Sequence, residues 1–147
     1  MLWWLTDVAR RAGAAMIEGN CAANPIIVDA LRGWDEAIPI VWEECEGRVA
    51  HQASSRFWLV DALGGAARGE SDSIVSITLV DGDRRLASVV FVPAADVVYF
   101  AGRNLGAWRQ RGAQPATRLR DSESIHQLTN SPTHQLQVRT TRVPVGR

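Results

Sequence analysis

The sequence predicts an α+β domain, a layered α/β sandwich in which two N-terminal helices pack on a mainly antiparallel sheet. Three observations predict it: helical periodicity over residues 3–18, a second helical segment over 24–33, and several strand-length apolar runs between 38 and 120.

Each helix has its own signals. In residues 3–18, apolar side chains recur every three or four positions, and Gly19 with Asn20 then ends the helical pattern. In the second segment Asn24 suits the N-cap, and Pro25 suits the first helical position, where its missing N–H would be unpaired in any case. Gly33 marks the end of this second helix.

Strands are predicted next. The apolar runs 38–42 and 57–60 read as short buried strands, each followed directly by acidic residues. Residues 74–120 read as an antiparallel meander, in which Asp81-Gly82 is a strong hairpin signal because Gly tolerates the positive φ of a tight turn. The strands expected in this meander are 74–80, 86–92, 97–101, 105–110 and 117–120, with further turns over 93–96 and at Arg111-Gly112.

The composition of the chain excludes several classes of protein. Sixteen arginines balance 16 acidic residues and there is no lysine, so no basic excess indicates a nucleic-acid polymer as partner. Apolar runs fall far short of the roughly 18 residues that span a bilayer, and the N-terminus lacks a basic region typical of a signal peptide. We therefore expect a cytoplasmic protein with no membrane partner, with one domain over residues 1–120 and a polar, irregular tail over 121–147.

Carboxylates follow both early strands. Glu43 and Glu44 come after the first strand, and Asp61 comes after the second. If the two strands are parallel neighbours, their C-terminal ends bring these oxygen ligands together, and Mg²⁺ prefers such ligands. The small-residue loop Gly64-Gly65-Ala66 offers backbone N–H groups to a phosphate. The alternative is that the acids are solvated and the glycines only turn the chain.

Several segments of the chain also resemble known sequences. IPIVWEEC (38–45) is similar to a strand with a Glu-Glu motif, and RFWLVDALGGA (56–66) is similar to a W-L-V-D-P-L-D-G-T segment. Residues 73–108, which end in LGAW, resemble the hairpins that follow that segment, and 7–17 and 22–33 resemble the two preceding helices. Together these segments identify a resemblance to the inositol monophosphatase superfamily, within it to CysQ-type 3'(2'),5'-bisphosphate nucleotidases, over about residues 5–120.

The resemblance implies the N-terminal half of the sugar-phosphatase fold and a divalent metal site. It assigns metal binding to Glu43, Asp61 and the main-chain carbonyl of Leu63, and it places Gly64, Gly65 and Ala66 in the substrate-binding loop. Other positions depart from the family pattern.

Three departures concern the catalytic groups. Gly64 stands where the family has its second Asp, Ala66 where it has Thr, and Asn20 where it has the Asp that works with that Thr. The family's second half, with a W-D motif that supplies another ligand, has no counterpart here. No residue is therefore assigned a catalytic role.

Two functions remain open at the level of sequence. The first is a CysQ-like, Mg²⁺-dependent phosphomonoesterase acting on a phosphorylated small molecule, with impaired or absent activity. The alternative is a non-catalytic remnant of that family, serving as a binding or oligomerisation module, for example as a homodimer. An out-of-frame origin of the tail after residue 121 is a further interpretation.

Overall fold

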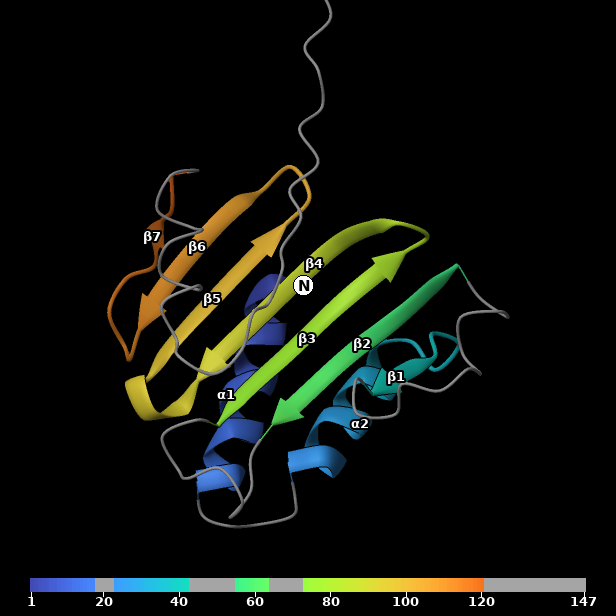
Figure 1. The fold of residues 1–147 in the computed structure, drawn as a ribbon, viewed down its shortest axis with the longest axis horizontal. Coiled ribbons are helices and arrows are strands. Elements are labelled where there is room, and N and C mark those ends of the chain that lie inside the picture. Colours follow the sequence, from blue (N-terminus) through green and yellow to red (C-terminus); the bar gives the residue numbers. More distant parts are fainter. Residues whose placement is uncertain (18–22, 43–54, 64–72, 121–147) are drawn as a thin grey trace, which may run out of the picture.

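The computed structural model describes residues 1–17, 23–42, 55–63 and 73–120 (Figure 1). Its elements are α1 (Leu2–Ile17), α2 (Ala23–Trp34), β1 (Ile40–Trp42), β2 (Arg56–Leu63), β3 (Ile74–Asp81), β4 (Arg84–Val92), the 3₁₀ turn η3 (Pro93–Ala95), β5 (Val97–Gly102), β6 (Gly106–Arg111) and β7 (Thr117–Arg118). The described strands form one seven-stranded sheet whose spatial order follows the chain from β1 to β7.

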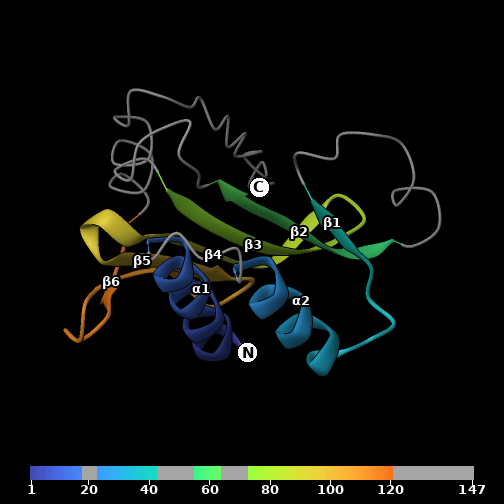
Figure 2. The ribbon, with the colours of Figure 1, turned by 90° about the horizontal axis from the view of Figure 1, so that it is seen from below.

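The sheet is antiparallel except at one edge. β1 and β2 pair in parallel, and every other neighbouring pair is antiparallel. Figure 2 shows α1 and α2 side by side on the same face of the sheet. The expected architecture, two helices on a mainly antiparallel sheet, is confirmed.

The helix boundaries differ slightly from those expected. α2 begins at Ala23, so Asn24 lies inside its first turn and the assignment of Asn24 as N-cap is wrong. Ala23 is buried in the core, and this packing stabilises a helix that begins one residue before Asn24. Pro25 still lies in the first turn, where a backbone N–H has no partner within the helix.

The two early strands differ in length from the expectation. β1 starts only at Ile40, since Pro39 has no N–H to give to a sheet, although its carbonyl accepts from Trp58 N at 2.8 Å. β2 continues through Asp61 to Leu63, because it pairs with β3 over its whole length, from Arg56 opposite Asp81 to Leu63 opposite Ile74. Asp61 is thus a strand residue and does not follow the strand as expected.

The expected turns of the meander are present. Gly82 has φ +62° in the β3–β4 turn, and Gly112 has φ +51° after β6, both in the left-handed region that favours glycine. Between β4 and β5 the chain turns through η3 and Asp96, which also has a positive φ, of 46°. These local signals therefore located the turns correctly.

The core lies between the helices and the sheet. Alternate residues of β2, β3, β4 and β5 face the helices, and those of β3 are Val75, Ile77 and Leu79. α1 approaches β4 so closely that a Cβ added at Gly13 would lie 2.6 Å from two ring carbons of Phe91. A residue larger than Gly at position 13 would therefore push α1 away from the sheet.

Arg10 on α1 makes polar contacts with two turns of the meander, the β4–β5 turn and the turn after β6. Arg10 donates from Nη1 to Asp96 Oδ1 at 2.7 Å and from Nη2 to the carbonyl of Gly112 at 3.2 Å. Its guanidinium also lies 5.2 Å from the centre of the Phe91 ring. Arg10 therefore fixes the position of α1 along the strands through charge, hydrogen bonds and ring contact together.

Two further expectations concern membrane-spanning helices and the C-terminal boundary of the domain. No helix in the described ranges is both long and apolar enough to cross a membrane. The expected tail, 121–147, lies outside the described residues, so the boundary at residue 120 stays a prediction.

Candidate metal and phosphate site

Parallel pairing at the sheet edge is the structural basis of the candidate site. Residues 40, 41 and 42 of β1 lie beside 58, 59 and 60 of β2, so Trp42 pairs with Val60. Both strands therefore run toward the same edge of the sheet, and Trp42 and Val60 immediately precede Glu43 and Asp61 in the sequence. The assumption that these two strands are parallel neighbours is confirmed.

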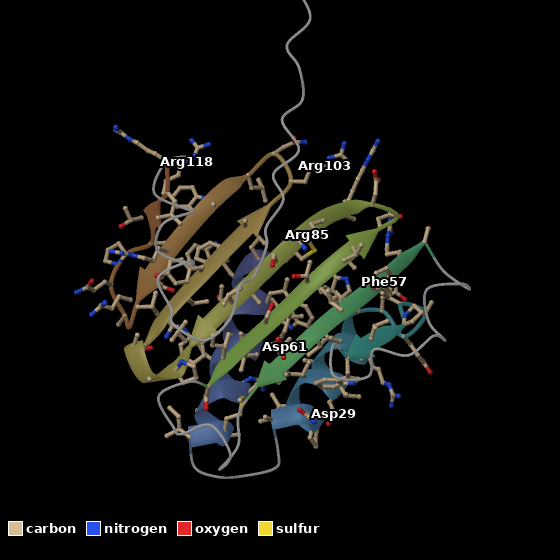
Figure 3. The ribbon with its side chains drawn as sticks, in the orientation of Figure 1. Asp29, Phe57, Asp61, Arg85, Arg103 and Arg118 are labelled. Atoms are coloured by element: carbon tan, nitrogen blue, oxygen red, sulfur yellow. The ribbon has the colours of Figure 1, made fainter. Side chains whose placement is uncertain are left out.

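Asp61 is the predicted metal ligand whose side chain the structure describes. Trp58 and Val60 face the helices, so the alternation of side chains along β2 places Asp61 on the opposite face of the sheet. Figure 3 shows its side chain in the C-terminal half of β2, beside β3. The residue is half-buried and its Oδ1 atom is shielded from solvent. A carboxylate so placed keeps little bulk water around it, which strengthens its interaction with any bound cation.

Leu63, the second described position of the predicted metal site, is the last residue of β2. It pairs with Ile74 at the start of β3 and lies two residues beyond Asp61 on the same strand. Because the ladder ends here, the main chain of Leu63 lies where the strand leaves the sheet. This is where a backbone carbonyl can serve as a ligand without disrupting the ladder.

The other predicted site residues lie outside the described parts of the chain. These are Glu43 among the metal ligands and Gly64, Gly65 and Ala66 in the predicted substrate-binding loop. Their convergence on Asp61 stays a prediction. Within the ranges that the structure describes, no group of three or more His, Cys, Asp and Glu residues is placed to hold a metal ion.

The described donors nonetheless suit a hard cation. A carboxylate and a main-chain carbonyl near one strand end are oxygen ligands, which Mg²⁺ prefers and which softer metals do not select. Glu43 would add the second carboxylate that balances the charge of the ion. The donor chemistry at Asp61 and Leu63 therefore fits magnesium as a partial ligand set.

Hydroxyl groups on the same face of the sheet were not predicted as part of the site. Ser76 on β3 lies directly opposite Asp61, and Thr78 lies opposite Ser88 of β4 with their hydroxyl oxygens 2.7 Å apart. The signal is present in the segment 74–80, where Ser76 and Thr78 alternate with Val75, Ile77 and Leu79. This polar alternation marks the face that carries Asp61.

A carboxyl group with a shifted pKa lies at the other end of the sheet. Asp81 accepts a hydrogen bond from Arg56 Nη2 at 2.8 Å, and this bond lowers the pKa of Asp81 below its ordinary value. The residues belong to the first pair of β2 with β3, whereas Asp61 lies five pairs further along. The Arg56–Asp81 pair therefore belongs to the sheet end and not to the candidate site.

Comparison with known proteins gives sequence relatives but no family model that matches. The chain is 30% identical over 122 residues to the 3'(2'),5'-bisphosphate nucleotidase CysQ of Escherichia coli (strain K12), and the match covers 79% of this chain and 49% of that protein. CysQ of Shigella flexneri gives the same values. The chain spans about half the length of the curated relatives it matches.

Solved structures of similar fold also match this chain over about half of their own length. The crystal structure of CysQ from Bacteroides thetaiotaomicron, a bacterial member of the inositol monophosphatase family, has a TM-score of 0.57 at 21% identity and matches 81% of this chain with 51% of its own. Inositol monophosphatase II from Staphylococcus aureus MSSA476 has a TM-score of 0.60 at 22% identity, over 80% of this chain and 50% of its own. The described elements correspond to the N-terminal half of that fold.

Proposed function

We propose that the chain, which is similar to CysQ over about half the length of that protein, is a CysQ-like member of the inositol monophosphatase superfamily. We propose further that it derives from a Mg²⁺-dependent phosphomonoesterase and retains impaired or no activity. The observation that supports the proposal is the parallel pairing of β1 with β2, in which Trp42 lies beside Val60. The E. coli relative is named as a 3'(2'),5'-bisphosphate nucleotidase, so a phosphorylated small molecule is the substrate class to test.

Retained residues would hold the ion and its phosphate. Glu43, Asp61 and the carbonyl of Leu63 supply oxygen ligands, and the backbone N–H groups of the loop Gly64-Gly65-Ala66 would face a phosphate group. Charge stabilisation of a phosphoryl group is the chemistry that Mg²⁺ supplies when it is bound.

Missing side chains account for the proposed impairment. Gly64 offers no carboxylate, Asn20 cannot accept a proton as a carboxylate can, and Ala66 has no hydroxyl to pass one along. A phosphatase site with too few anionic ligands binds its metal weakly and does not orient the attacking water. Metal binding should therefore survive these substitutions better than turnover does.

The test uses the purified 147-residue chain and a matched pair of variants. We expect MgCl₂ titration by calorimetry to give measurable binding, and phosphate release from adenosine 3',5'-bisphosphate to stay far below that of E. coli CysQ assayed in parallel. Asp61→Asn should weaken Mg²⁺ binding by more than the roughly 10- to 100-fold typical of losing an outer hydrogen-bond partner of a ligand. Asp29→Asn, which changes an exposed carboxylate on α2, should leave binding unaltered.

Either part of the proposal can be contradicted separately. Phosphate release at the rate of CysQ would refute the impairment. Failure of the wild-type chain to bind Mg²⁺ at millimolar concentration would refute the retained metal site.

A binding or oligomerisation module is the second candidate function. Two large apolar side chains support it: Trp3 on α1 is 61% exposed, and Leu105 in the β5–β6 turn is 56% exposed. An interface requires such side chains to form part of a contiguous apolar patch, since single exposed apolar residues are normal on protein surfaces. Light scattering after size exclusion distinguishes the candidates, because a dimer without a Mg²⁺ response favours the module and a monomer that binds Mg²⁺ favours the phosphatase.

A further inference from the structure

An apolar patch lies where α1 meets the β5–β6 hairpin, and its members are Trp3, Leu105 and Trp108. The ring of Trp3 lies 5.1 Å from that of Phe100 on β5, and Trp108 on β6 is directly opposite Phe100. Trp108 Nε1 donates to the carbonyl of Leu105 at 3.0 Å. These contacts join two exposed side chains and a half-buried one into a contiguous surface, which single scattered apolar residues do not form.

Leu105 connects the hairpin to the start of α1. A Cβ added at Gly102 would lie 3.0 Å from Leu105 Cδ1 and 3.1 Å from Leu2 Cδ1, so both leucine side chains lie over Gly102. Among the described elements, α1 packs mainly on β3, β4 and β5, and α2 packs on α1 and β2. Figure 2 shows β6 beyond α1, on the side away from α2. The patch therefore lies on the flank of α1 that α2 does not cover.

Two exposed arginines flank the apolar patch. Arg103 lies in the β5–β6 turn, and Arg118 on β7 is directly opposite Trp108. Residues 97–120 hold five Arg and no acidic residue, although the whole chain is neutral. Within the part of the chain that the structure describes, neither Arg103 nor Arg118 is in an ion pair. Figure 3 shows both at the same end of the sheet, so the surroundings of the patch are positively charged.

Arg118 is held against the patch by two contacts. Its guanidinium carbon lies 6.0 Å from the centre of the Trp108 ring. A Cβ added at Gly106 would lie 3.0 Å from Arg118 Nε, so the missing side chain at Gly106 lets the guanidinium approach the strand. A planar guanidinium that rests on a ring loses little further freedom when its N–H groups bind a carboxylate. The surface thus offers an apolar anchor site beside a positioned cationic donor.

We propose that this surface docks an acidic peptide segment of a partner protein that carries a large apolar side chain. The apolar side chain packs on Trp3 and Leu105, and its carboxylates pair with Arg103 and Arg118. A nucleic-acid strand suits the surface less well, because the chain as a whole is neutral and a polyanion requires many cations along its path. This inference rests on the second candidate function, the binding module, and it does not depend on Mg²⁺.

Fluorescence anisotropy on the full chain tests the proposal with a defined probe, a fluorescein-labelled peptide that carries Leu on one helical face and Glu on the other. The control peptide has Lys in place of every Glu. The wild type should bind the Glu peptide, more weakly as salt is added, and should not bind the Lys peptide. Trp3→Ala should weaken binding roughly 10-fold, as loss of an aromatic anchor does, while Trp34→Ala at the exposed end of α2 should leave it unaltered.

Charge exchange tests the two arginines directly. Arg103→Glu combined with Arg118→Glu should abolish binding of the Glu peptide and create binding of the Lys peptide, because the sign of the surface is reversed. Arg32→Glu on α2 should change neither affinity. Both substituted arginines are exposed, so this variant tests the proposal even if Trp3→Ala does not fold.

Four results would overturn the inference. They are no binding of the Glu peptide by the wild type, equal binding of both peptides, tighter binding of a fluorescein-labelled oligo-dT strand, and unchanged peptide selectivity in the charge-exchange variant. A dimer in light scattering that Trp3→Ala dissociates would also overturn the peptide partner, since a second copy would then occupy the surface, but it would uphold the oligomerisation module. MgCl₂ titration is measured separately, so each of these results leaves the proposed metal site standing.

Discussion

The two faces of the sheet are built from the same strands but have different chemistry. The face toward α1 and α2 carries Trp58, Val60 and Ile77, which are all fully buried. The other face places Asp61 and Ser76 at positions adjacent to these residues along β2 and β3. Because side chains alternate along a strand, one ladder can hold a core on one side and a polar site on the other. The core thereby sets the register that brings the polar side chains together.

The largest expected difference between the faces is in stability, and β3 offers a matched pair. Ile77 is fully buried toward the helices and Ile74 is half-buried on the opposite face. Ile77→Ala should lower the free energy of unfolding by about 2–5 kcal/mol, from lost burial and the cavity left behind. Ile74→Ala should cost about half of that or less, because the half-buried Ile74 side chain has less apolar area removed from water on folding.

Urea denaturation of both variants measures this difference. Equal losses in the two variants would show instead that the opposite face is as tightly packed as the face toward the helices.

A smaller effect is expected from the hydroxyl pair on the opposite face. Thr78→Val leaves Ser88 without its partner at 2.7 Å, and we expect a loss of about 1 kcal/mol in the free energy of unfolding. Adding Ser88→Ala should cost less than the two single changes summed, because removal of both hydroxyls leaves neither unsatisfied. A double-mutant cycle by urea denaturation measures the coupling, and strict additivity would mean that the hydroxyls act independently.

The smallest effect is expected at the sheet end, where the Arg56–Asp81 pair meets solvent. The hydrogen bond from Arg56 lowers the pKa of Asp81, so the native state favours the ionised carboxylate more than the unfolded state does. The associated stability is present above the ordinary pKa of Asp, near 3.8, and is lost as the pH falls through the lowered value. Salt screens such an exposed pair, so the contribution is slight.

Nuclear magnetic resonance titration tests this shift directly. In Arg56→Gln the pKa of Asp81 should rise toward the ordinary value, while Arg32→Gln on α2 should not move it. An unchanged pKa in Arg56→Gln would assign the shift to another neighbour.

Local sequence signals predicted which helices, strands and turns form more accurately than they predicted the residues at which these elements begin and end. Gly82 and Gly112 marked turns correctly, because positive φ is a property of single residues. Asn24 and Asp61 were assigned to the wrong sides of their boundaries, because tertiary contacts extended α2 and β2 past the polar residues. Ser76 was missed because its alternation with Val75 and Ile77 shows which face of the strand it shares, but not that Asp61 is its cross-strand neighbour.

By itself, the sequence determined the order of two helices and a meander, the turns, and which side chains share a face of each strand. These follow from periods of 3.6 and 2 residues and from the φ angles that single residues tolerate. Only the tertiary structure decided that β1 lies parallel beside β2, that β2 runs on through Asp61, and that Ser76 lies opposite Asp61. Strand partners and register depend on contacts between distant segments, which are fixed only when the whole sheet packs against its helices.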